Sequence, residues 1–127
     1  MSKENKKIAV YCRVARRDDD AIKSQTRTLV LFAVDKGYSE IRIYQDNGEG
    51  GHFLDRPALN QLNADILDGQ IQAVAVTDLS RISRMQRLLY EWLCMALAQN
   101  IEIVPIHGDV DGTMYLRNLI YQFFNKR

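Results

Sequence analysis

Short apolar runs alternate with stretches of helical periodicity along the whole chain, and this alternation limits the fold more than any other feature. The apolar runs, which are typical of buried strands, cover residues 8–14, 40–45, 71–79 and 101–108. Apolar residues recur at helical spacing over residues 20–36, 57–68, 85–99 and 113–127. Strands joined through helices usually pair in parallel, and the helices then cover the sheet. The sequence therefore predicts an α/β fold: a mainly parallel four- to five-stranded sheet with helices on both faces.

Individual residues mark where several of these elements begin and end. Gly37 suits the C-terminal cap of the first helix, and Pro57 suits the first turn of the second. Pro105 has no backbone N–H to donate, so its strand is predicted to lie at a sheet edge or to end there. The glycine-rich stretch from Asp46 to Asp55 is predicted to be a long, mobile loop.

The overall composition is that of one globular domain, predicted over residues 1–127. A net charge of +1 gives no broad positive field, although it leaves room for a local basic patch. No apolar stretch reaches the about 20 residues that span a bilayer, and the N-terminus lacks the apolar region of a signal peptide. The two cysteines, Cys12 and Cys94, have no CxxC spacing. We therefore expect a cytoplasmic protein without membrane contact.

Residues able to form a site follow the ends of three predicted strands. Arg13 and Ala15 come at the end of the first strand, Asp46 follows the second, and Arg81 follows the third. The carboxyl ends of parallel strands feed the loops in which α/β proteins build their binding sites. The sequence therefore predicts a functional site at this edge of the sheet.

Four arginines are the main candidates for that site: Arg13, Arg56, Arg81 and Arg84. Arg13 interrupts an apolar strand, so its guanidinium must find a partner or reach a cleft. Arg81 and Arg84 are three residues apart, so they project to one side if a helix starts there. Clustered guanidiniums suit a phosphate or phosphodiester, which they bind through paired hydrogen bonds. Separate surface ion pairs with the nearby aspartates are equally compatible with these residue types.

Several segments together resemble the catalytic domain of the resolvase/invertase family of serine recombinases. They are IAVYCRVA at residues 8–15, Gln25, YQDNGEGGHFLDRPALNQL at residues 44–62, and DLSRISR at residues 78–84. Their order and spacing match the family over nearly the whole chain. In that family a serine after the first strand attacks a DNA phosphodiester and forms a phosphoserine without a metal, while arginines stabilise the transition state. The resemblance therefore implies DNA as the partner, no cofactor and no metal.

The resemblance also assigns active-site positions, with four informative departures. The matching residues are Arg13, Gln25, Asp46, Arg56, Arg81 and Arg84. The family's nucleophilic serine falls on Ala15, and the aspartate of its Asp-Arg-Leu-x-Arg segment falls on Ser80. The Ser-Gly pair of the family's mobile loop reads Gly50-Gly51, and its glutamine-rich turn reads RRDDD. We therefore expect a domain built for site-specific DNA cleavage and strand exchange whose own cleavage is impaired.

No other side chain is a strong substitute for the missing nucleophile. Ser80 and Ser83 leave from a different strand end, and a misplacement of about 1 Å can cost on the order of a hundredfold in rate. Tyr11 lies deeper in the core than Arg13, and Cys12 points to the opposite face of its strand. Asp78 lies two residues before Ser80 and so on the same face of the predicted strand. It is a candidate replacement for the family carboxylate that is missing at Ser80.

A phosphate-accepting receiver domain is a competing class, because Asp18–Asp20 follow the first strand. Such a domain also needs an aspartate after its third strand and a lysine after its last. The segment IEIVPIHG at residues 101–108 offers no lysine, so this reading is disfavoured unless Asp18–Asp20 bind Mg²⁺. His52 and His107 are isolated and have no metal-ligand spacing.

The last predicted helix, residues 113–127, carries a strongly apolar side formed by Leu116, Leu119, Ile120, Phe123 and Phe124. We expect a homo-oligomer contact there, which also permits mixed assemblies with an active recombinase. A C-terminal DNA-binding domain is expected to be absent from this chain, so binding to the DNA phosphate backbone should be weak. The alternative function is a non-enzymatic pseudo-recombinase, acting as a DNA-phosphate-binding or oligomerisation and regulatory module.

Overall fold

Four parallel strands form the sheet of this protein, whose computed structural model describes residues 6–107. The strands are β1 (Lys7–Val14), β2 (Glu40–Asn47), β3 (Ala73–Val76) and β4 (Glu102–Pro105), in the order β2-β1-β3-β4. The helices are α1 (Asp19–Asp35), α2 (Pro57–Leu67) and α3 (Gln86–Ala98), with a short 3₁₀ helix, η1 (Leu79–Arg81). All three strand pairings are parallel, which confirms the predicted α/β fold.

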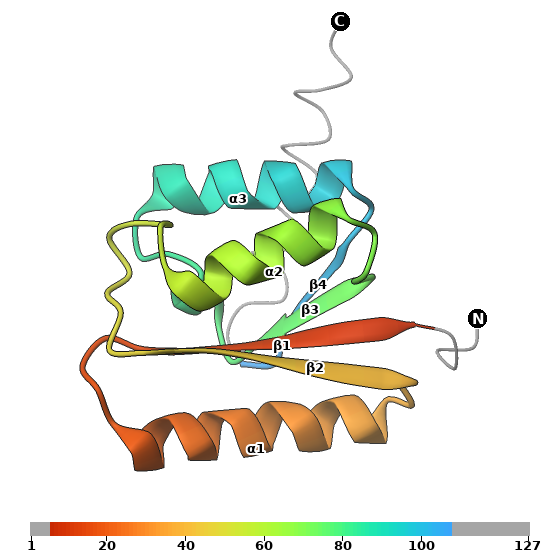
Figure 1. Ribbon diagram of the computed structural model, residues 1–127, viewed down its shortest axis with the longest axis horizontal. Helices are drawn as coiled ribbons and strands as arrows, with labels where there is room; N and C mark the ends of the chain where they lie inside the picture. Colours follow the sequence, from red (N-terminus) through yellow and green to blue (C-terminus); the bar gives the residue numbers. More distant parts are fainter. Residues whose placement is uncertain (1–5, 108–127) are drawn as a thin grey trace, which may run out of the picture.

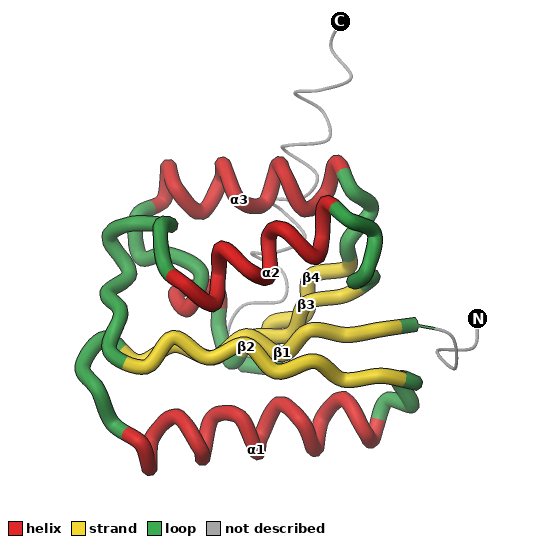
Figure 2. Tube along the Cα trace, in the orientation of Figure 1, coloured by secondary structure: helices red, strands yellow, loops and turns green. Residues whose placement is uncertain are grey.

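Helices cover both faces of the sheet, as the sequence predicts (Figures 1 and 2). Helix α1 packs below the sheet in these views, and α2 and α3 pack above it. Strand β1 supplies both cores because its side chains alternate. Ile8, Val10 and Cys12 join the core under α1, whereas Ala9 and Tyr11 join the core shared with α2 and α3. The opposite orientation of Tyr11 and Cys12 is thereby confirmed.

Local chemistry sets the ends of the helices. The side chain of Asp18 caps α1 by accepting a hydrogen bond from Ala21 N. After α1 the chain turns at Gly37, whose φ of +84° favours a residue without a side chain. Pro57 stands at the first position of α2, where its missing N–H leaves no hydrogen bond unmade. The expectations for Gly37 and Pro57 are therefore confirmed.

The third and fourth strands are shorter than predicted. Strand β3 ends at Val76, because Asp78 accepts a hydrogen bond from Ser80 N and starts η1 in place of further strand. Strand β4 ends at Pro105 and lies at the edge of the sheet, as expected for a proline without an N–H. The predicted helix over residues 113–127 lies outside the described residues.

The helices are amphipathic, with one buried side each. Helix α3 buries Trp92, Leu93 and Ala96, and Trp92 donates its indole N–H to Asn63 Oδ1 at 2.8 Å. Within residues 6–107, no helix is long and apolar enough to cross a membrane.

Two leucines of α2 provide a matched test of this packing. Leu62 is completely buried, whereas Leu67 is 60 % exposed. We expect Leu62→Ala to lower the free energy of unfolding by about 2–5 kcal/mol, because a buried cavity replaces the lost methyl groups. Leu67→Ala should change it by less than about 0.5 kcal/mol. Urea denaturation followed by circular dichroism measures both, and equal effects would contradict the assignment of the buried face.

Candidate active site

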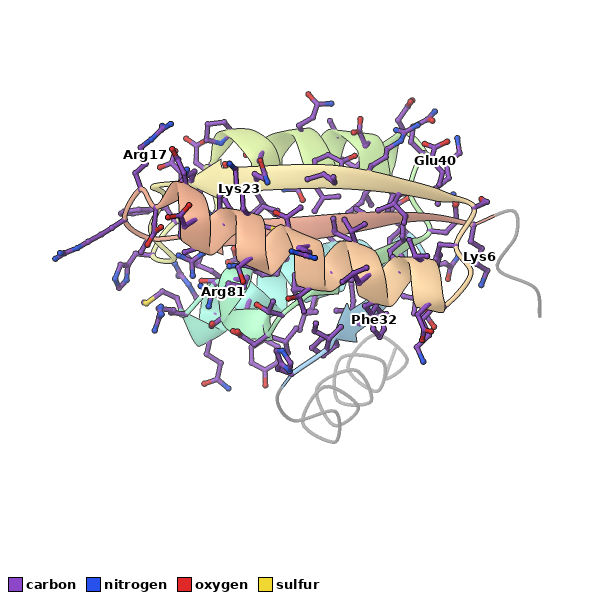
Figure 3. The ribbon with its side chains drawn as sticks, turned by 90° about the horizontal axis from the view of Figure 1, so that it is seen from below. Lys6, Arg17, Lys23, Phe32, Glu40 and Arg81 are labelled. Atoms are coloured by element: carbon purple, nitrogen blue, oxygen red, sulfur yellow. The ribbon has the colours of Figure 1, made fainter. Side chains whose placement is uncertain are left out.

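The residues predicted for a site gather at the carboxyl end of the sheet. Figure 3 shows Arg17 and Arg81 at one end of the molecule and Lys6 and Glu40 at the opposite end. Strand β1 leads to this end through Arg13 and Val14, and Ala15 is the first residue beyond it. The prediction of a site where the strands end therefore agrees with the placement of its residues.

Arg13 is completely buried, and backbone carbonyls receive its guanidinium. Nε donates to Arg81 O at 2.9 Å, Nη1 to Glu49 O at 3.0 Å, and Nη2 to Ser80 O at 2.7 Å. An arginine in an apolar strand requires a partner, and Arg13 finds it in the main chain of η1 and of the glycine-rich loop.

Arg56 is buried beside Arg13 and is bound in a similar way. Its Nε donates to Phe53 O and its Nη1 to Arg81 O, both at 2.9 Å, and its Nη2 donates to Ile82 O. Nη1 also donates to Tyr11 Oη at 2.9 Å. Because Arg13 and Arg56 share the carbonyl of Arg81, the two guanidiniums lie against the same turn.

Arg81 returns the contact with Arg13. Its Nη1 donates to Arg13 O at 3.0 Å, so each arginine binds the main chain of the other. Its Nε lies 3.6 Å from Asp78 Oδ2, and the side chain is partly exposed. Arg84, three residues further, is exposed at the surface. The four predicted arginines therefore form one cluster with two buried and two accessible members.

Gln25 holds the main chain of Arg13. Its Oε1 accepts from Arg13 N at 2.9 Å, and its Nε2 donates to Arg13 O at 3.2 Å. Strand β3 pairs with β1 only as far as Val10, so the amide of Gln25 supplies the hydrogen bonds that a longer neighbour strand would make. Gln25 thus positions Arg13 through its backbone.

The carboxylate of Asp46 is fully occupied within the fold. It accepts from Ala58 N at 2.8 Å and from Leu59 N at 3.0 Å, which caps α2, and from Tyr11 Oη at 2.6 Å. Burial and then this hydrogen bond raise the pKa of Tyr11 far above its usual value, so the phenol stays protonated. Asp46 therefore joins the cluster through Tyr11 rather than by direct contact with an arginine.

The cluster carries positive charge with little compensation. Within residues 6–107, no carboxylate lies at ion-pair distance from Arg13, Arg56 or Arg84. Burial, followed by the neighbouring guanidinium of Arg56, lowers the pKa of Arg13 from its usual value. Among the described residues, the ion pairs with aspartates that the sequence leaves open are therefore absent for these three arginines, and the site can attract an anion.

Ala15 and Ser80 are the departures from the family pattern that stand at active-site positions. Ala15 is exposed, and its methyl group cannot attack. The Ser80 hydroxyl donates to Asp78 Oδ1, so this aspartate does contact the position of the lost carboxylate. Burial raises the pKa of Asp78, but hydrogen bonds from Ser80 and the charge of Arg81 outweigh it and leave the pKa below its usual value. Asp78 is thus a weak base for activating Ser80.

Sequence reasoning missed three contacts of the site, all involving the glycine-rich loop. Glu49 contributes a carbonyl rather than its carboxylate, and Gly51 is buried against the guanidinium of Arg13. Ser83 donates its hydroxyl to Gly51 O at 2.9 Å. Only the close approach of Gly51 leaves a sequence signal, because this residue matches the glycine of the Ser-Gly pair in the resembled family. Within residues 6–107, no three or more His, Cys, Asp or Glu side chains are grouped to hold a metal ion.

Solved structures with this fold are catalytic domains of recombination enzymes. The N-terminal catalytic domain of TP901-1 integrase matches with a TM-score of 0.78 and 25% identity, over 95% of this chain and 98% of that one. The C-terminal catalytic domain of ISC1926 TnpA, described as an IS607-like serine recombinase, matches with a TM-score of 0.75 and 20% identity, over 92% and 80%. The fold is therefore that of serine recombinase catalytic domains.

Sequence comparison gives the family itself. The family described as "Resolvase, N terminal domain" matches residues 8–126, and the chain belongs to it. A "Putative DNA recombinase" of Bacillus subtilis (strain 168) is 33% identical over 106 residues, which are 80% of this chain and 21% of that protein. A "Putative resolvase" of Acanthamoeba polyphaga mimivirus is 33% identical over 113 residues, 89% of this chain and 56% of that one. The chain thus spans between a fifth and about half of these relatives' lengths.

Asp46 offers a test of the network below the arginines. Asp46→Ala leaves three donors without their acceptor, so we expect the free energy of unfolding to fall by about 3 kcal/mol. Asp55→Ala is the matched control, because Asp55 is exposed and accepts from one side-chain amide, that of Asn60. It should cost less than about 1 kcal/mol. Urea denaturation measures both, and a loss for Asp46→Ala no larger than the control's would refute the capping role.

Proposed function

We propose that this domain binds the phosphodiester backbone of DNA at its arginine cluster and does not cleave it. The main observation behind this proposal is that four guanidiniums converge at the carboxyl end of the sheet, and that three of them have no ion-paired carboxylate within residues 6–107. Guanidiniums suit phosphate because their paired donors match its oxygens. Membership of the resolvase family agrees with DNA as the partner.

The two accessible arginines make the first contacts in this proposal. Arg84 is exposed and Arg81 partly so, which lets both reach a phosphate from solvent. Arg13 and Arg56 are buried behind them and add positive charge whose attraction acts at a distance. Gln25 serves this arrangement by fixing the backbone of Arg13.

Strand cleavage needs a nucleophile that this site lacks. Ala15 occupies the position that the family gives to serine, and it has no hydroxyl. Ser80 is hydrogen-bonded to Asp78, whose lowered pKa makes it a poor acceptor of the serine proton. The domain therefore holds DNA without forming a phosphoserine, as a pseudo-recombinase would.

DNA binding through Arg84 can be measured directly. We expect Arg84→Ala to weaken binding of a short duplex roughly fivefold and to lower the slope of log K against log salt by about one. Arg42→Ala is the matched control, because Arg42 binds Glu40 at the opposite end of the sheet. Fluorescence anisotropy at several salt concentrations gives both quantities.

The competing function is an oligomerisation module that has no use for the arginines. In that case Arg84→Ala and Arg42→Ala would behave alike, and neither would change the salt dependence. Assembly with an active recombinase belongs to this competing function.

Restoring the nucleophile tests the loss of cleavage. We expect Ala15→Ser combined with Ser80→Asp to form a covalent adduct with supercoiled DNA, because this pair of changes returns the two missing side chains of the family pattern to a site that keeps its four arginines. The unaltered protein should form none. Denaturing gel electrophoresis with labelled DNA detects such adducts, and an adduct from the unaltered chain would overturn the proposal of a silent site.

A further inference from the structure

The glycine-rich loop after β2 crosses the candidate site as a strap, defined here as residues 48–51. It starts at the end of β1, where Gly48 N and Glu49 N both donate to Val14 O, at 2.9 Å and 3.0 Å. Val14, which accepts these two hydrogen bonds, is the residue immediately before Ala15. The strap therefore begins beside the position that the family gives to its nucleophile.

The middle of the strap covers the guanidinium of Arg13. Glu49 O accepts from Arg13 Nη1 at 3.0 Å, and Gly51 packs against the other nitrogen. A methyl group added to Gly51 would lie 2.9 Å from Arg13 Nη2 and 3.2 Å from Arg13 Cζ. Arg13 has no exposed surface in this arrangement, so it cannot touch a ligand.

A latch holds the far end of the strap. Gly51 O accepts two hydrogen bonds, from Ser83 Oγ at 2.9 Å and from Arg84 N at 3.2 Å. Ser83 is only 2 % exposed, and its hydroxyl also accepts from Met85 N at 3.0 Å. The strap is therefore tied to the segment that carries the two accessible arginines.

We propose that the strap is a gate over Arg13 that Ser83 latches, and that a phosphate reaches Arg13 only when Gly51 leaves this latch. The gate rests on the proposed function, because it regulates access to the same arginine cluster. Opening breaks the bonds to Gly51 O and the bond between Glu49 O and Arg13. Phosphate oxygens can then replace the carbonyl oxygen of Glu49 as acceptors for the freed guanidinium.

Two substitutions open the gate by different means. Ser83→Ala removes one of the two hydrogen bonds to Gly51 O. Gly51→Ala pushes the strap outwards, because the added methyl group meets a guanidinium that Ser80 O and Arg81 O already hold in place. Ser24→Ala, on the exposed side of α1, is the matched control for a lost serine hydroxyl.

Chemical modification of arginine measures the gate without any DNA. Phenylglyoxal should label Arg84 quickly in the unaltered protein and Arg13 slowly, with the rates read by mass spectrometry. We expect both Ser83→Ala and Gly51→Ala to raise the rate at Arg13 roughly fivefold, the change that one lost hydrogen bond produces. Ser24→Ala should leave it unchanged.

Arg56 separates gate opening from unfolding. It is equally buried, but it binds the carbonyls of Phe53, Arg81 and Ile82, none of which belongs to the strap. Faster labelling of Arg13 alone supports the gate. Rapid labelling of Arg13 in the unaltered protein, no change in either variant, or equal acceleration at Arg56 would each overturn it.

Binding of a short DNA duplex to the same variants tests the proposed function separately. If the gate admits phosphate, the variants with faster Arg13 labelling should also bind the duplex more tightly. If the variants show faster labelling of Arg13 but neither they nor the unaltered protein bind DNA, the proposed function is refuted. The gate is supported in that case.

Discussion

The reciprocal contact between Arg13 and Arg81 is the interaction on which the rest of the site depends. Each guanidinium donates to the main-chain carbonyl of the other residue, at 2.9 Å and 3.0 Å. This exchange ties the end of β1 to the turn that follows β3, beyond the point where the two strands pair. Gln25 completes the connection by binding the same backbone unit from α1. At the carboxyl end of the sheet, side chains therefore connect the segments that a longer β3 would otherwise connect to β1.

This use of arginine links the stability of the domain to its charge. A buried guanidinium without partners would be very costly, and carbonyl dipoles reduce that cost without cancelling the charge. An ion-paired carboxylate would have neutralised Arg13 or Arg56 and removed their attraction for an anion. Because the partners are carbonyls, the same side chains support the fold and keep the site positive.

The sequence predicts the strands, the helices and the edge at which the site lies, because these follow from periodicity and from capping residues. It also brings the four arginines together, through their match to a family pattern. The sequence does not reveal which groups these arginines bind, because every residue type carries the same backbone carbonyl. Asp46 illustrates the difference: the resemblance assigns it to the active site, and only the structure reveals the three hydrogen bonds that it accepts there. The length of β3 was missed because the turn at Asp78 depends on one local hydrogen bond.

Because Ala15 is exposed, a change between serine and alanine at this position would leave the shape of the site intact. The residue stands beyond β1 and belongs to neither core, so exchanging a hydroxyl for a hydrogen there removes no packing. Arg13 and Arg56, in contrast, are held by the carbonyls of three successive residues, 80–82, and could not be removed without opening the fold. The position of Ala15 is therefore the most expendable part of the candidate site, and the arginine framework is the least expendable.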